Sequence, residues 1–338
     1  MIDKLLVTTN IPFMNVVQKI ARYSIPWLKR NVSLYGPRLL RRIKLVVCRR
    51  SQPDGILVAG PFVGELGYEI GEWIPHLAGL TNRLNCRLHV FANKGHQALY
   101  PFAEKIIPFD FSAHNVDCNW LRNPSGEQIE LFGKYTQQAW DYCSSPGCKG
   151  GFRTIELCGG KQMFRVFDDK VPVKLCAAQE AVEKWKNELP ENKKIVLTYR
   201  ALQRGGERNS NPECIEKLAA FIIKKGWTPV LVGRIDSGFS VPSSGAVNLV
   251  NKTTLEDLIA IYRLSSVVVG SSTGIIHLAA ACRVPHITWG STFPDDTVVR
   301  RYNRDWNLNN TWVRFVSKDW DVDAEMIQDV LIQAAEIK

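Results

Sequence analysis

Short apolar runs alternate with amphipathic helical stretches along most of this chain, and no other feature constrains its fold as strongly. In the second half, apolar runs of strand length are separated by stretches whose apolar residues recur at helical spacing. We expect strands at Ile195–Tyr199, Pro229–Gly233, Val247–Leu249, Val267–Gly270 and His286–Trp289, and helices at Pro212–Lys225, Thr254–Leu264, Ile275–Cys282 and Ala324–Ile337. This alternation is typical of open parallel sheets, so the sequence predicts the α/β class.

The first half repeats the pattern less regularly. Its expected strands are Gly55–Gly60 and Arg87–Ala92, and its expected helices are Tyr68–Leu80 and Gln97–Lys105. Residues 111–165 are rich in aromatics and glycines and are expected to form an irregular binding-loop insertion. Two α/β domains facing a cleft are therefore predicted, with ligands at the carboxyl ends of their strands. The expected segments are 51–167 and 177–318 for the domains, 168–176 for the linker and 319–338 for a closing helix.

Residues 1–50 carry the net charge of the whole chain. They hold 11 of the 43 basic residues and one of the 33 acidic residues, so the remainder holds 32 of each. Apolar residues recur there at helical spacing, among them Phe13, Val16, Val17 and Ile20. A basic amphipathic helix lies on an anionic membrane surface or packs as an arm against protein, and both readings stay open. The rest of the chain has no net charge, which disfavours a nucleic-acid partner.

Composition favours a folded protein without membrane spans. Hydrophobic residues make up 45% and charged residues 22%, and no apolar run approaches the roughly 20 residues that cross a bilayer. No secretory signal is expected, and the nine scattered cysteines are usual for reduced cytosolic thiols. Cys143 and Cys148 are the only close pair, so no zinc site is expected. We therefore expect a cytoplasmic protein, peripheral on the inner face of the membrane if residues 1–50 bind there.

The turn after the strand Val267–Gly270 is the strongest candidate site. Ser272 and Thr273 follow this strand, and a helix begins near Gly274. A helix start offers unpaired N–H groups and the positive end of its dipole, and a glycine lets a phosphate approach the backbone. Ser272 and Thr273 can cap the helix or donate hydroxyls to phosphate oxygens. An ordinary capped strand–turn–helix explains the same residues, and local physics leaves both readings open.

The wider segment resembles the C-terminal domain of glycosyltransferase family nine, the ADP-heptose:lipopolysaccharide heptosyltransferases. The likeness rests on Asn248–Leu258, on Ser-Ser-Thr-Gly-Ile-Ile-His-Leu-Ala-Ala-Ala from Ser271, and on Trp-Gly-Ser-Thr from Trp289. It covers about residues 193–317, and the N-terminal half in outline only. Ser271 and Ser272 stand where the family usually has Asn-Asp. The resemblance implies the GT-B fold, a sugar-nucleotide donor, and a structural or donor-positioning role for His277.

A basic loop follows the first strand of the C-terminal domain. Arg200, Arg204 and Arg208 surround a pair of glycines there. Arginine forks fit diphosphate oxygens and stabilise the charge on a departing nucleotide, whereas a solvated basic surface is the plainer reading. In the resembling transferases the corresponding loop faces the diphosphate. Asp236, after the next strand, can accept a ribose hydroxyl or simply cap a turn.

A glycine-rich loop follows the first strand of the N-terminal domain and contains Glu65, Glu69 and Glu72. In family-nine enzymes the corresponding loop carries Gly-Asp, and Gly64-Glu65 matches it best, which implies that Glu65 is the catalytic base. An inverting transferase needs a carboxylate to take the proton of the acceptor hydroxyl. Glu69 is the competing candidate for the base. Glu69 and Glu72 also suit a helix N-terminus without any catalytic role.

These elements predict an inverting glycosyltransferase that needs neither metal nor cofactor. It would move a sugar from a nucleotide-diphosphate donor to a cell-surface glycan or lipid-linked acceptor. The acidic pairs Asp168-Asp169 and Asp295-Asp296 lack the loop context of a metal-binding Asp-x-Asp motif. Two alternatives stay open. The same fold can serve a sugar-nucleotide epimerase or another enzyme, and the absence of an acid at Ser272 favours a non-catalytic protein that binds sugar nucleotides or glycans.

Overall fold

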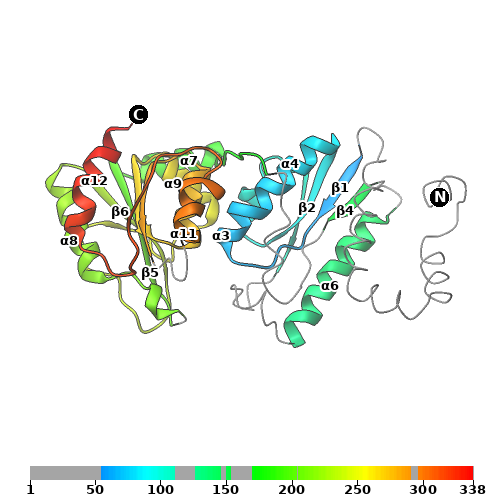
Figure 1. Cartoon of the computed structure of the whole chain (residues 1–338), viewed down its shortest axis with the longest axis horizontal. Coiled ribbons are helices and arrows are strands. Elements are labelled where there is room, and N and C mark those ends of the chain that lie inside the picture. The colour runs from blue at the N-terminus through cyan, green and yellow to red at the C-terminus, as the bar shows by residue number, and fades with distance from the viewer. Residues whose placement is uncertain are drawn as a thin grey trace, which may run out of the picture. The chain divides into compact units, whose positions relative to one another are not determined.

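The computed structural model describes residues 55–110, 126–145, 150–153, 170–203, 205–290 and 296–337. The chain divides into two compact units, Met1–Gln52 and Pro53–Lys338, and every described residue belongs to the second. The basic segment 1–50 thus lies outside the described residues. Figure 1 shows that the second unit contains two α/β lobes, each built around one sheet.

The N-terminal lobe is built on a four-stranded parallel sheet in the order β3-β2-β1-β4. Its strands are β1 (Ile56–Ala59), β2 (Arg87–Asn93), β3 (Lys105–Phe109) and β4 (Gly150–Arg153). After β1 the chain runs without a break through α3 (Leu66–Tyr68), the π-helical turn η1 (Glu69–Trp73) and α4 (Ile74–Leu84). The 3-10 turn η2 (Gln97–Leu99) connects β2 to β3, and α6 (Gly126–Cys143) precedes β4. Every β1 side chain is buried, as expected for a central parallel strand.

The C-terminal lobe is built on a six-stranded parallel sheet in the order β10-β9-β8-β5-β6-β7. Its strands are β5 (Lys194–Ala201), β6 (Thr228–Ile235), β7 (Val247–Asn248), β8 (Val267–Ser271), β9 (His286–Trp289) and β10 (Val313–Ser317). Its helices are α7 (Gln179–Glu188), α8 (Pro212–Lys224), α9 (Leu255–Arg263), α10 (Gly274–Ala281), α11 (Thr297–Arg300) and α12 (Ala324–Glu336). Two short turns complete it, η5 (Gly206–Arg208) and the π-helical η6 (Arg301–Asp305).

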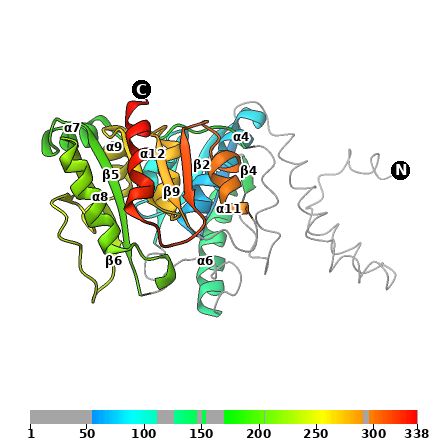
Figure 2. The ribbon, with the colours of Figure 1, turned by 60° about the vertical axis from the view of Figure 1, so that its left-hand side comes forward.

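Side chains of successive residues in the central strands pack on opposite faces of this sheet. Val267 and Val269 pack in a cluster with α8 and α12, whereas Val268 packs in a cluster with α9 and α10. Side chains alternate along a strand, so an unbroken valine run is apolar on both faces. Figures 1 and 2 show α8 and α12 lying together beside the sheet.

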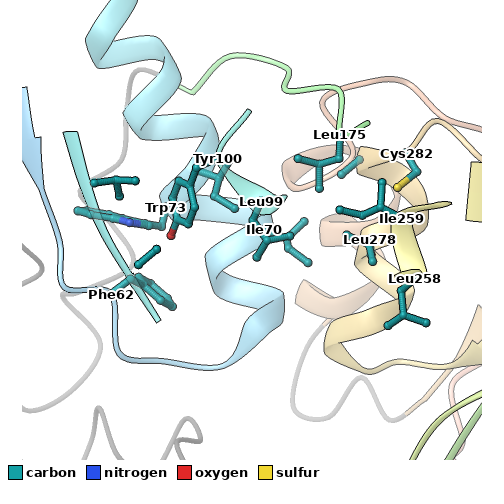
Figure 3. Close-up of a cluster of buried hydrophobic side chains, with 14 of the residues drawn as sticks. Phe62, Ile70, Trp73, Leu99, Tyr100, Leu175, Leu258, Ile259, Leu278 and Cys282 are labelled. Carbon is teal, nitrogen blue, oxygen red and sulfur yellow. The ribbon is translucent and has the colours of Figure 1, made fainter. Parts of the chain in front are cut away.

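One buried cluster continues from the N-terminal lobe into the C-terminal lobe. Figure 3 shows Ile70 and Leu99 of the N-terminal lobe near Leu175, Ile259 and Leu278. Two glycines one helical turn apart allow this close packing. A Cβ on Gly71 would overlap the Trp306 indole, and a Cβ on Gly67 would lie 3.2 Å from Cδ2 of His277. The contact between the lobes therefore depends on the absence of side chains at both glycines.

The strands and helices predicted for the second half are confirmed, with ends that differ by at most two residues. The predicted helix over Gln97–Lys105 is wrong, because only the short turn η2 forms and Lys105 already begins β3. Pro101 explains the difference, since the residue before a proline disfavours the α conformation. The prediction of an irregular insertion over residues 111–165 is wrong for Gly126–Cys143, because these residues form helix α6. No helix among the described residues is long and apolar enough to cross a membrane.

Candidate active site

Glu65 lies at the N-terminal end of α3. It faces the segment 200–208 at the end of β5, which carries Arg200 and Arg208 and is called the arginine loop below. Its backbone is extended and its carbonyl oxygen accepts the N–H of Tyr68 at 3.0 Å, which closes the first helical turn. Oε1 of Glu65 lies 3.8 Å from Nη1 of Arg208, and both side chains are partly exposed. The structure thus brings together an acid and an arginine that are far apart in the sequence.

Glu69 is placed differently, one turn further along the same helical stretch. Its side chain is only 2% exposed. The hydroxyl of Tyr100 donates to Oε1 at 2.5 Å, and Nδ1 of His96 lies 2.6 Å from Oε2. Burial lowers the pKa of His96, but the charge of Glu69 and its hydrogen bond leave that pKa raised. Glu69 therefore belongs to an internal network, and Glu65 is the acid that solvent can reach.

Glu72 also has a packing role rather than an open position. It accepts a hydrogen bond of 2.7 Å from Nε1 of Trp306, and its Oε2 lies 3.1 Å from Nζ of Lys170. Lys170 in turn donates to the carbonyl oxygen of Asp305 at 2.9 Å. These contacts tie the helical stretch of the N-terminal lobe to the segment before α7 and to η6.

The Ser272–Gly274 turn connects β8 to α10 as expected. The N–H of Ser272 donates to the carbonyl of Trp289 at 2.7 Å, and the hydroxyl of Tyr302 donates to its Oγ at 3.1 Å. Thr273 occupies the N-cap position with an extended backbone, but its side chain makes no capping hydrogen bond. The first N–H groups of α10 therefore lack the capping bond that a threonine can supply at this position.

Gly274 has a second constraint that the sequence does not reveal. A Cβ at this position would lie 2.9 Å from Cβ of Leu66 and 3.1 Å from the backbone nitrogen of Gly67. The start of α10 thus packs directly against the turn that carries Glu65. A bulky residue at 274 would separate the two lobes as well as obstruct a phosphate, so substituting this glycine cannot test phosphate binding alone.

Two of the three predicted arginines lie side by side, and Arg204 lies outside the described residues. Nη1 of Arg200 donates to the carbonyl of Gly205 at 2.7 Å and to Oδ1 of Asn209 at 2.6 Å. Burial, and after it the charge of Arg208, lowers the pKa of Arg200. Nε of Arg208 is buried without a hydrogen-bond partner among the described residues. Nε of Arg208 also lies 3.8 Å from Oε1 of Glu207. Two adjacent guanidinium groups with a donor that makes no hydrogen bond are suited to bind phosphate oxygens.

Asp236 supports the arginine loop from the neighbouring strand. Its Oδ2 accepts the N–H of Gln203 at 2.9 Å, and its own N–H donates to the carbonyl of Ala201 at 2.9 Å. This is the turn-capping arrangement that the sequence left open. The second carboxylate oxygen still has capacity for a ribose hydroxyl.

His277 is 8% exposed and packs between aromatic rings. Its ring stacks on Tyr302, with ring centroids 4.2 Å apart. It also makes an edge-to-face contact with Trp306, with ring centroids 4.7 Å apart. Burial first, and then the charges of His286 and Arg301, hold the pKa of His277 well below its usual range. A neutral, stacked imidazole supports a structural or positioning role.

The segment Arg301–Trp306 was missed by sequence reasoning, although it contributes Tyr302 and Trp306 to these contacts. Its residues follow no helical or strand periodicity, and η6 is a π-helical turn that periodicity does not detect. The density of arginine and aromatic residues was the available signal. Among the described residues, no group of three or more His, Cys, Asp or Glu side chains is placed to hold a metal ion.

Comparison with known proteins finds one family similar to part of this chain. Residues 228–317 match the model of glycosyltransferase family 9 (heptosyltransferase). No curated protein matches the chain in sequence. The structure of the E. coli ADP-heptose LPS heptosyltransferase II is similar, with a TM-score of 0.54 and 15% identity over 83% of this chain and 98% of that one. The structure of a family 9 glycosyl transferase from Veillonella parvula DSM 2008 is also similar, with a TM-score of 0.57 and 14% identity over 85% of this chain and 98% of that one.

At these identities the solved structures establish the fold, which is GT-B: two Rossmann-like lobes, each with a parallel sheet. The family match covers most of the second lobe, from β6 to β10, including the Ser272–Gly274 turn and His277. This chain is thus similar to family 9 glycosyltransferases in the sequence of residues 228–317 and in its fold.

Proposed function

We propose that this enzyme transfers a sugar from a nucleotide-diphosphate-sugar donor to a hydroxyl of a cell-surface glycan or lipid-linked acceptor, with inversion and without a metal ion. The observation that supports this most directly is the approach of Arg208 to Glu65, 3.8 Å between Nη1 and Oε1. It joins a group suited to a diphosphate with a group suited to a hydroxyl proton.

In the proposed reaction Glu65 takes the proton of the acceptor hydroxyl as its oxygen attacks the anomeric carbon. The bond from that carbon to the diphosphate oxygen breaks at the same time, and the nucleoside diphosphate leaves with the bonding electrons. Arg200 and Arg208 stabilise the charge that develops on the leaving group. The guanidinium of Arg200 is already held in place by two hydrogen bonds, and that of Arg208 lies beside it. Thr273 and the N–H groups that start α10 supply further donors to the diphosphate, and Asp236 accepts a ribose hydroxyl.

Nucleotide binding is the first test of this function. ADP, GDP, UDP and CDP should be compared by thermal shift, and at least one should raise the melting temperature, because a ligand that binds only the folded state stabilises it. ADP-heptose is the first donor to supply for turnover, since the matched family is described as heptosyltransferases. Donor isomerisation without an acceptor would identify an epimerase, and binding without turnover on any acceptor would identify a binding protein. No shift with any nucleotide would exclude the proposal.

We further propose that residues 1–50 hold the enzyme at the cytoplasmic face of a membrane, where a lipid-linked acceptor is presented. Their excess of basic residues over acidic ones is ten, and clusters of basic residues bind anionic lipid surfaces. Deleting residues 1–50 should release the protein from phosphatidylserine-containing vesicles in a sedimentation assay and leave the nucleotide thermal shift unchanged. Neutral phosphatidylcholine vesicles are the control. Equal sedimentation of both forms with anionic vesicles would contradict this role.

A further inference from the structure

Arg301 is held in place by two aromatic rings. Its guanidinium carbon lies 5.0 Å from the ring centroid of Tyr68 and 4.6 Å from that of Trp306. Nη2 also donates a hydrogen bond of 3.1 Å to the hydroxyl of Tyr68. Aromatic faces attract a guanidinium and restrict its orientation, so this cation is ordered before any ligand arrives.

The charge of Arg301 is not neutralised within the described part of the chain. No carboxylate there lies within ion-pair distance of it, although its neighbours Arg300 and Arg304 both pair with Asp305, at 3.8 Å and 2.8 Å. The side chain is partly exposed. A guanidinium carries several N–H donors, and among the described residues only the bond to Tyr68 uses one. Arg301 thus keeps both its charge and most of its donors for another partner.

The position of Arg301 relates it to the arginine loop. Tyr68 is one helical turn from Glu65, since its N–H donates to the Glu65 carbonyl, and Glu65 pairs with Arg208. Arg301 and Arg208 therefore contact the same turn, although they come from loops about 90 residues apart. Gly67, within this turn, packs against Gly274 at the start of α10. The two cations and the helix start thus all contact residues 65–68 of the N-terminal lobe.

We propose that Arg301 binds a phosphate of the donor diphosphate, and that Tyr68 and Trp306 are positioning residues that orient its guanidinium. The inference rests on the proposed function, because it assigns a further residue to the same leaving group. Guanidinium forks bind phosphate oxygens in two-point contacts, and a diphosphate has oxygens for arginines on either side. Nε of Arg208, which is buried without a hydrogen-bond partner among the described residues, is an unused donor beside the same turn.

The test compares wild type with Arg301→Met, Arg301→Lys and Arg304→Ala by titration calorimetry, using ADP, GDP, UDP and CDP and the matching monophosphates. Methionine keeps a flexible apolar stem against Tyr68 and Trp306 but removes the charge. Arg301→Met should lower affinity for the preferred diphosphate about 10- to 100-fold, the usual size of a lost charged hydrogen bond. It should also reduce the preference for diphosphate over monophosphate. Arg301→Lys keeps the charge but lacks the planar fork, so its diphosphate affinity should lie between those of wild type and Arg301→Met.

Arg304→Ala is the matched control, since Arg304 lies on the same turn with its own partner Asp305, and it should bind like wild type. Tyr68→Phe keeps the ring and removes only the hydroxyl, so a loss of affinity of a few fold at an unchanged melting temperature would support a positioning role. Wild-type diphosphate affinity in a folded Arg301→Met variant would overturn the inference while the proposed function stands. If Arg301→Met does not fold, wild-type diphosphate affinity in Arg301→Lys would overturn the inference instead. Absence of nucleotide binding by wild type would overturn both.

Discussion

Replacing Glu65 by Gln should lower turnover by about 10²–10⁴-fold and leave nucleotide-diphosphate affinity close to that of wild type. Glutamine keeps the size and hydrogen bonding of the side chain but cannot take a proton, and general-base assistance commonly contributes this factor. The carboxylate is placed for the role because it is partly exposed at the start of α3 and next to Arg208. Single-turnover kinetics with saturating donor measures the effect on the chemical step directly.

The pH dependence gives a second readout of the same prediction. A general base must be ionised, so the wild-type pH–rate profile should show an acidic limb that is absent in Glu65→Gln. Glu69→Gln is the comparison variant. Because Glu69 is buried and bonded to His96 and Tyr100, its substitution should lower the melting temperature more than the turnover of the folded enzyme. Loss of turnover in Glu69→Gln with near-normal Glu65→Gln would move the base to Glu69.

Replacing Arg208 by Ala should lower kcat by about 10²–10³-fold, the usual result of removing one group that stabilises developing negative charge. The guanidinium lies beside Arg200 and Gly205, and its Nε makes no hydrogen bond among the described residues. Its contact with the leaving group should strengthen as the glycosidic bond breaks, so the KM for the acceptor should change far less than kcat. Steady-state kinetics with varied acceptor at saturating donor separates the two constants.

Lys217→Ala is a suitable control for Arg208→Ala. Lys217 is a cation of the same lobe that pairs with Glu213 on the exposed side of α8, so its loss should leave kcat unchanged. Arg208→Lys should recover only part of the activity, because an ammonium group lacks the planar fork. An Arg208→Ala enzyme with wild-type kcat would mean that the loop is only a solvated basic surface.

Much of the fold could be predicted from periodicity alone. Buried parallel strands read as continuous apolar runs, as in Val267–Val269, and the amphipathic helices α8, α9 and α12 show their apolar faces in the spacing of single residues. Elements with weaker local signals were missed, among them α7 and β10, and α6 was obscured by the composition of the surrounding residues. These segments owe their structure mainly to packing on the lobes, which a local pattern does not contain.

The candidate site divides in the same way. The sequence by itself determined that the Ser272–Gly274 turn starts a helix and that arginines follow β5, because both are local facts of residue type and position. Only the tertiary structure decided that Glu65 meets Arg208 while Glu69 is enclosed by His96 and Tyr100. Glu65 and Glu69 stand four residues apart with identical chemistry, so only the long-range contacts of each side chain could separate an accessible acid from a buried one.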